Sequence, residues 1–146
     1  MTFDRINTSE WPILHISIMN APVDNEEIDM FQAKFLALLR LARDGADGIP
    51  PEKICLIMDM DGIAEATWEQ KLRAAAFIQD VREFVADTIY CTALITSSDI
   101  VRMVLDLIFK IQPLISLNKL FEDEASALKW SRENRVRQLD NLPPVY

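Results

Sequence analysis

The sequence predicts an α/β fold in which one domain is built as a sandwich of a four-to-five-stranded, mostly parallel sheet and about four helices. Two observations predict it. Apolar runs of strand length alternate along the chain with segments whose apolar residues recur every three or four positions. Strands that alternate with amphipathic helices through short connections form a largely parallel sheet covered by helices. The length of 146 residues is that of one domain.

Capping residues and turns set the expected boundaries of the elements. Asp24 can cap the first helix, and Glu27 stands three residues later, as a capping box requires. Thr67 and Gln70 repeat this spacing at the start of a second helix. We expect strands at 11–19, 54–58, 89–96 and 115–121, a short strand or arm at 3–8, and helices at 24–44, 67–85, 99–111 and 123–134.

The end of the chain lacks these patterns. Residues 135–146 contain two prolines and no apolar periodicity. We therefore expect an α/β domain over residues 1–134, followed by an extended or mobile tail over residues 135–146.

Composition narrows the classes of partner. The net charge of −8 argues against nucleic acid and anionic lipid, because both are bound mainly by lysine and arginine. The most apolar stretch, 101–117, is interrupted by charged residues and a proline, so no membrane span is expected. Cys55 and Cys91 each lie in an apolar strand run, which is typical of reduced core thiols in a cytoplasmic protein. With three glycines and no glycine-rich phosphate loop, the sequence predicts no nucleotide cofactor.

Polar residues follow two of the expected strands. Asp59 and Asp61 end the strand at 54–58, while Thr96 and Asp99 follow the next strand. Ligands of α/β sheets tend to bind beyond the carboxyl ends of the strands, so these four residues form a candidate polar cleft.

The run Asp59-Met60-Asp61-Gly62 resembles the first motif of haloacid dehalogenase-type phosphotransferases. The resemblance implies that Asp59 is a nucleophile, that Asp61 is a general acid or base, and that Mg²⁺ bridges carboxylate and phosphate. Thr96-Ser97 resembles the second motif of that family. A lysine in a distinctive context and a later acidic pair at a strand end are missing, so a Mg²⁺-dependent phosphatase is the alternative hypothesis and no metal ligands are assigned.

Three hydroxyl residues are candidate phosphoacceptors. Thr67, Ser97 and Ser98 lie at expected helix N-termini, where a phosphate would meet the positive end of the helix dipole. Capping of the helix by the same hydroxyls explains their positions equally well.

The helix expected at 99–111 is apolar around most of its circumference. Such a helix is either buried on two sides or presented to a partner. Its second stripe, Val101, Leu105 and Phe109, is the candidate surface for a protein partner or a small apolar ligand. The first stripe consists of Ile100, Met103, Val104, Leu107, Ile108 and Ile111.

The second half of the chain resembles STAS and SpoIIAA-like domains. The resemblance rests on Ala93-Leu94-Ile95-Thr96-Ser97, on Lys119-Leu120-Phe121 and on Ala127-Leu128-Lys129-Trp130. It covers roughly residues 10–134 and implies an α/β sandwich of a mostly non-enzymatic family that acts by protein-protein contact. Some of its members are switched by phosphorylation. The Asp-Ser-Gly of the phosphorylated members is missing, because this chain has Glu65-Ala66-Thr67 there.

These observations lead to one expected function. The chain is interpreted as a non-enzymatic cytoplasmic regulatory or signalling module that works by protein-protein contact, as a homodimer or with another protein. A small apolar ligand under the helix at 99–111 is a further hypothesis.

Overall fold

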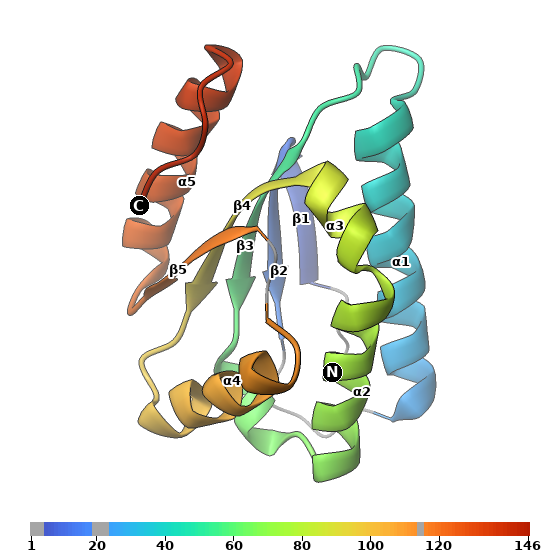
Figure 1. Ribbon diagram of the computed structural model, residues 1–146, viewed down its shortest axis with the longest axis vertical. Coiled ribbons are helices and arrows are strands. Elements are labelled where there is room, and N and C mark those ends of the chain that lie inside the picture. Colours follow the sequence, from blue (N-terminus) through green and yellow to red (C-terminus); the bar gives the residue numbers. More distant parts are fainter. Residues whose placement is uncertain (1–4, 19–23, 114–115) are drawn as a thin grey trace.

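The computed structural model of the chain describes residues 5–18, 24–113 and 116–146. These residues form an α/β fold around a five-stranded sheet whose strands lie side by side in chain order (Figure 1). The first pair of strands is antiparallel, and every other neighbouring pair is parallel. The predicted fold class is confirmed. The strands are β1 (Arg5–Glu10), β2 (Ile13–Ser17), β3 (Ile54–Asp59), β4 (Ile89–Ile95) and β5 (Leu117–Phe121).

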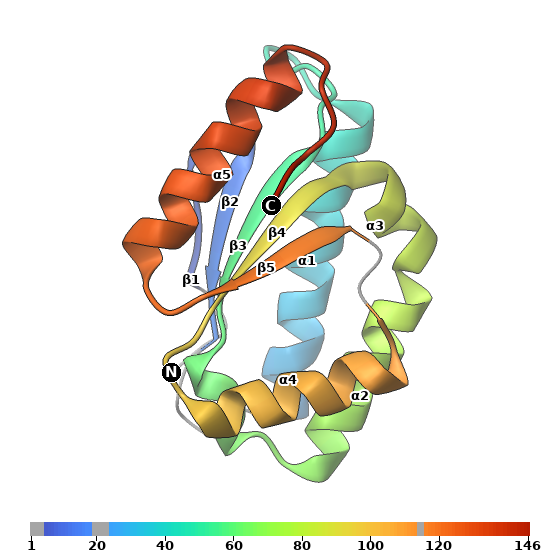
Figure 2. The ribbon, with the colours of Figure 1, turned by 60° about the vertical axis from the view of Figure 1, so that its left-hand side comes forward.

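Helices cover both faces of the sheet and one of its ends. Figures 1 and 2 show α5 on one face, α1 and α3 on the other, and α4 beyond the carboxyl ends of the strands. None of the helices in the described part of the chain is long and apolar enough to cross a membrane. The helices are α1 (Asn25–Asp44), η1 (Asp61–Glu65, a 3-10 helix), α2 (Trp68–Asp80), α3 (Arg82–Thr88), α4 (Asp99–Ile111) and α5 (Glu124–Leu139).

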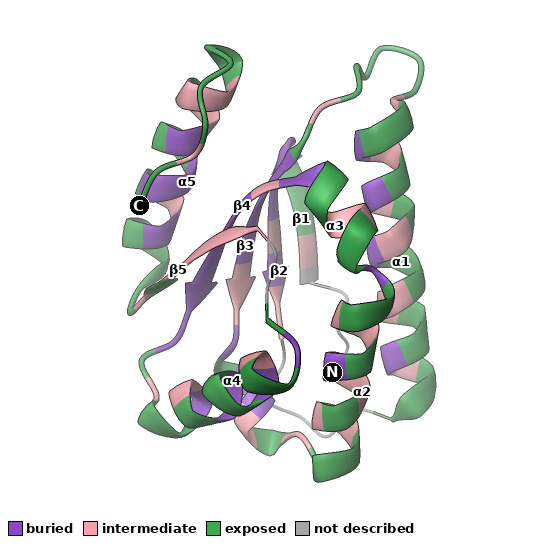
Figure 3. Ribbon diagram, in the orientation of Figure 1, coloured by how far each residue is buried: buried purple, intermediate pink, exposed green. Residues whose placement is uncertain are grey.

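The face under α5 holds one core cluster. Successive side chains of a strand point to opposite faces, so Cys55 and Ile57 lie under α5 while Leu56 faces α1. Trp130 of α5 closes the cluster, and its ring centroid lies 5.5 Å from that of Phe121 on β5. Buried residues are densest along β3 and β4, the two strands at the centre of the sheet (Figure 3).

The opposite face is divided into two core clusters because the expected helix at 67–85 is broken. The break lies at Val81, which ends α2 and precedes α3 with φ −99° and ψ 6°. Ala75 of α2 packs in the cluster with α4, whereas Phe84 and Val85 of α3 pack in the cluster with α1. The break therefore lets consecutive segments of the chain bury their apolar sides against different neighbours.

The C-terminal boundary differs from the prediction. The last helix continues five residues beyond Asn134, to Leu139, because no proline or glycine interrupts it before Pro143. Asn141 then adopts a left-handed conformation with φ 56° and turns the chain back. The tail is thus residues 140–146 and not 135–146.

The tail packs along α5 through hydrogen bonds. The Asn134 side chain, 1% exposed, donates to the Val145 carbonyl at 3.1 Å and accepts from the Val145 amide at 2.9 Å. The Trp130 indole nitrogen donates to the same carbonyl at 3.0 Å. Arg137 donates to the Pro143 carbonyl at 2.8 Å. These contacts fix the extended tail against the domain.

Candidate functional site

The candidate polar cleft forms in part at the carboxyl ends of β3 and β4. Asp59 and Ile95 are register partners, which brings the residues that follow the two strands together. The Thr96 hydroxyl donates to Asp61 Oδ1 at 2.7 Å, and the Asp61 amide donates to Asp59 Oδ1 at 3.2 Å. Asp99 lies in the exposed first turn of α4. Among the described residues, no three His, Cys, Asp or Glu side chains are grouped so that they could hold a metal ion.

Thr96 links this strand end to α4. Its side chain is fully buried and, besides donating to Asp61, accepts a hydrogen bond from the Ser98 amide at 3.1 Å. Ser98 is the N-cap of α4, and its hydroxyl accepts from the Val101 amide at 3.3 Å. These hydrogen bonds hold the N-terminus of α4 against the end of β4.

We expect Thr96→Val to lower the free energy of unfolding by about 2 kcal/mol, because it leaves the half-buried Ser98 amide and the Asp61 carboxylate without their hydroxyl partner. The matched control is Thr96→Ser, which keeps the hydroxyl and should lose less than half as much. Urea denaturation followed by circular dichroism measures both. Equal losses in the two variants would show that the methyl group, and not the hydroxyl, matters at this position.

The candidate phosphoacceptors lie at helix starts, as expected. The Thr67 hydroxyl accepts from the Gln70 amide at 3.1 Å, and the Gln70 side chain accepts from the Thr67 amide at 2.9 Å, which completes a capping box. Ser98 caps α4, and Ser97 before it is exposed. Two of the three hydroxyls therefore have a capping role in the structure.

The stripe that the sequence analysis assigned to a partner does not lie at the surface. Val101 is fully buried and Leu105 is 4% exposed, while Phe109 is half-buried against the same cluster. As an exposed protein-contact surface this assignment is wrong, because the stripe faces η1, α2 and the sheet. Leu105 and Phe109 instead line a cavity between α4, its neighbouring helices and the sheet.

The exposed side of α4 is formed by part of the other stripe, and we call it the outward face of α4. Its four members are large and apolar, with exposed fractions of 65%, 71%, 37% and 49% for Ile100, Met103, Leu107 and Ile111. They follow one another at spacings of three and four residues, so they form a continuous strip along the helix.

Charged residues border the outward face on one edge. Asp99 stands at the N-terminal end of α4 and Lys110 at its C-terminal end, with Asp106 one turn before Lys110. All three are exposed. Arg102, farther round the helix, is paired with Glu122 at 3.4 Å.

A cavity of about 200 Å³, partly open to solvent, lies between the sheet and helices α1, α2 and α4. An apolar ligand under α4 was predicted from the sequence, but the walls that α1 and α2 contribute were not. The side chains that line the cavity are mainly aliphatic and aromatic and include Ile28, Phe31, Phe35, Leu56, Met58, Phe77, Ile78, Leu94, Leu105, Ile108 and Phe109.

The two cysteines lie opposite each other on β3 and β4 and form no disulfide. A hydrogen bond with Cys55, together with burial, raises the pKa of the Cys91 thiol well above its ordinary value. Because a thiolate is the reactive form, Cys91 is a core residue and not a nucleophile. His15, the single histidine of the chain, places Nδ1 3.5 Å from Glu124 at the start of α5.

Comparisons with known proteins return no relative. No protein family model matches the chain, and no curated protein or solved structure shows significant similarity to it. The resemblance to STAS and SpoIIAA-like domains stays a prediction, and so does the resemblance to haloacid dehalogenase-type enzymes.

Proposed function

We propose that this chain is a non-enzymatic regulatory module that acts by protein-protein contact through the outward face of α4. The observation that carries the proposal is the exposure of Ile100, Met103, Leu107 and Ile111 along one helix side. Single exposed apolar residues are common on protein surfaces, but a continuous strip marks a surface that a partner covers. Burial of apolar area stabilises such a contact by about 25 cal/mol per Å².

The partner that fits this surface is a second copy of the chain, with the two α4 helices antiparallel. In a twofold dimer of this kind, Ile100 of one copy meets Ile111 of the other, and Met103 meets Leu107. The same operation brings Asp99 of each copy beside Lys110 of the other on the shared edge of the strip. Opposite charges at the two ends of α4 therefore favour the antiparallel orientation, in which they lie beside each other.

The α4 strip is the centre of the proposed contact and not its whole area. A stable interface buries about 800 Å² on each partner, more than one side of a 13-residue helix provides. Helix α2 packs against α4 and exposes Trp68 and Leu72 on its own surface. We expect the interface to extend from α4 onto this neighbour.

A phosphatase is the second candidate function, and one observation favours it. Asp59, Asp61 and Thr96 come together at adjacent strand ends, which is where a phosphotransferase of haloacid dehalogenase type would hold its nucleophile and phosphoryl ligands. However, the Asp61 carboxylate accepts a hydrogen bond from the Thr96 hydroxyl, and this bond helps to position α4. The protein-contact function accounts for these contacts without a reaction.

Sedimentation equilibrium tests the proposal. We expect the mean mass to rise with protein concentration from the chain mass of 16.7 kDa towards twice that value. We also expect no Mg²⁺-dependent hydrolysis of an aryl phosphate by the same sample. A mass that stays at that of one chain up to millimolar concentration would contradict the dimer. Hydrolysis that disappears in Asp59→Asn would establish the phosphatase instead.

A further inference from the structure

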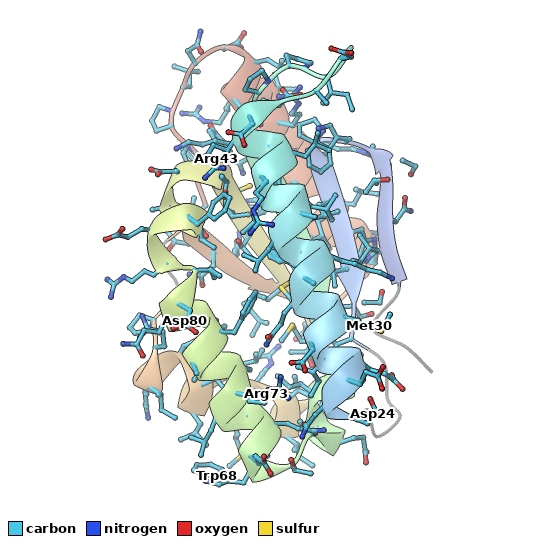
Figure 4. The ribbon with its side chains drawn as sticks, turned by 90° about the vertical axis from the view of Figure 1, so that its right-hand side faces the viewer. Asp24, Met30, Arg43, Trp68, Arg73 and Asp80 are labelled. Atoms are coloured by element: carbon cyan, nitrogen blue, oxygen red, sulfur yellow. The ribbon has the colours of Figure 1, made fainter. Side chains whose placement is uncertain are left out.

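The cavity is elongated along two helices that run side by side in the same direction. Asp29 of α1 pairs with Arg73 of α2 at one level, and Phe35 lies 6.2 Å from Phe77 between ring centroids farther along both helices. Figure 4 shows α1 and α2 next to each other with Arg73 at their junction. The cavity lies on the sheet side of this pair and follows its length.

Three polar side chains of the lining lie together at one end of the cavity. Glu65, Gln70 and Lys71 line it around the first turn of α2. At the other end the lining changes to Val81, Val85 and Ile89, which carry no side-chain hydrogen-bonding group. The cavity therefore offers a polar end and an apolar end to a single occupant.

Two further polar groups line the wall nearest the strands. The Thr92 and Ser116 hydroxyls lie 3.2 Å apart and hydrogen-bond each other, so this wall satisfies its own polar atoms. Gln32 lines the cavity partway along α1.

Lys71 sets the charge that the polar end prefers. Its side chain is half-buried against the cavity, whereas Glu65 is exposed and its charge is therefore screened by water. An anionic group at this end could pair with the Lys71 ammonium group, and hydrogen bonds between charged partners are stronger than those between neutral ones.

We propose that the cavity binds a medium-chain carboxylate, with the chain between α1, α2 and the sheet and the carboxylate at Lys71. The volume of about 200 Å³ sets the size of the ligand. An apolar protein cavity of about 150 Å³ admits benzene, so this one admits a somewhat larger molecule, such as an eight-carbon chain, but no long-chain fatty acid. The site is separate from the outward face of α4, and the inference does not rest on the proposed function.

Ala74 allows a direct test because it lines the cavity on α2. Ala74→Leu adds an isopropyl group to the space that the chain of the ligand would occupy. We expect octanoate to bind the natural protein in a one-to-one, saturable manner in calorimetry, and Ala74→Leu to reduce its affinity by about tenfold or more, as overfilling of a packed space predicts. Ala76→Leu is the matched control, since Ala76 is exposed on the same helix and should leave the affinity unchanged.

Octanol and hexadecanoate complete the experiment. Lys71→Met should reduce the affinity for octanoate by about tenfold, which is the effect of losing a hydrogen bond to a charged group. It should leave the affinity for octanol unchanged. Hexadecanoate should bind far more weakly than octanoate. Absence of octanoate binding at millimolar concentration, equal binding by Ala74→Leu when circular dichroism shows it folded, or equal binding of hexadecanoate would overturn the site. If Ala74→Leu does not fold, Ala74→Val provides the same comparison. An octanoate affinity that Lys71→Met does not change would overturn the carboxylate assignment.

Discussion

Replacing Trp130 with alanine is expected to lower the free energy of unfolding by about 4 kcal/mol, the usual cost of deleting a large aromatic side chain from a core. Trp130 is 6% exposed and closes the cluster under α5. Its ring packs on Phe121, and its indole nitrogen binds the Val145 carbonyl. The variant therefore loses core volume and the tail contact together. Urea denaturation monitored by circular dichroism measures the change.

Trp130→Phe separates these two contributions. It keeps an aromatic ring in the cluster but removes the indole N–H, so we expect it to lose about 1 kcal/mol from the hydrogen bond and somewhat more from the smaller ring. A loss below about 1 kcal/mol in Trp130→Ala would mean that α5 contributes little to the core, which the packing described here does not allow.

Met103→Glu is expected to weaken the dimer strongly with little effect on folding. Met103 lies near the middle of the outward face of α4 and is 71% exposed in the single chain. A carboxylate there stays solvated in the monomer, but the proposed dimer would bury it among apolar side chains. We expect the dissociation constant to rise by about 30-fold or more, which corresponds to about 2 kcal/mol. Sedimentation equilibrium gives the constant, and thermal denaturation gives the stability.

Met30→Glu is the matched control for this substitution. Met30 is also an exposed methionine on a helix, 51% exposed, but it belongs to α1 on another side of the molecule (Figure 4). Met30→Glu introduces the same change of charge as Met103→Glu but leaves α4 unchanged. Equal weakening of the dimer by both variants would indicate a general effect of net charge and would remove α4 from the interface.

Local patterns were sufficient to predict the sheet and most helix boundaries. Asp24, Thr67, Ser98 and Asp123 all cap helices in the structure, because a short polar side chain at that position satisfies helix amides whatever the tertiary context. The break at Val81 could not be predicted in this way. It has no proline or glycine, and the packing of Ala75 with α4 and of Phe84 and Val85 with α1 depends on contacts far apart in the sequence.

The assignment of Val101, Leu105 and Phe109 to an exposed surface of α4 was wrong, although the polar residues of the helix indicate which side is buried. Asp99, Asp106 and Lys110 lie on one side of a helical wheel, and the side opposite them contains Val101 and Val104. Because Val101 lies opposite these charged residues, the sequence predicts that it is buried. The apolar residues next to the polar edge, Ile100 and Met103 among them, are the exposed ones.

Part of the strand-end cluster was predictable, and the cavity was not. Asp59, Asp61 and Thr96 come together because parallel strands end at the same edge, which requires only the order of the strands. The cavity depends on how α1, α2 and α4 are spaced above the sheet. That spacing depends on long-range packing and leaves no periodic pattern in the sequence.

The central claim, an antiparallel contact between two α4 helices, is tested most directly by isotope-filtered NMR on a mixture of labelled and unlabelled chains. Ile100 and Ile111 are separated by eleven residues of helix, or about 16 Å, so a nuclear Overhauser effect between their methyl groups must come from two different molecules. We predict intermolecular effects between Ile100 and Ile111 and between Met103 and Leu107. Intermolecular effects confined to another surface, or none at a concentration where the mass is that of two chains, would contradict the claim.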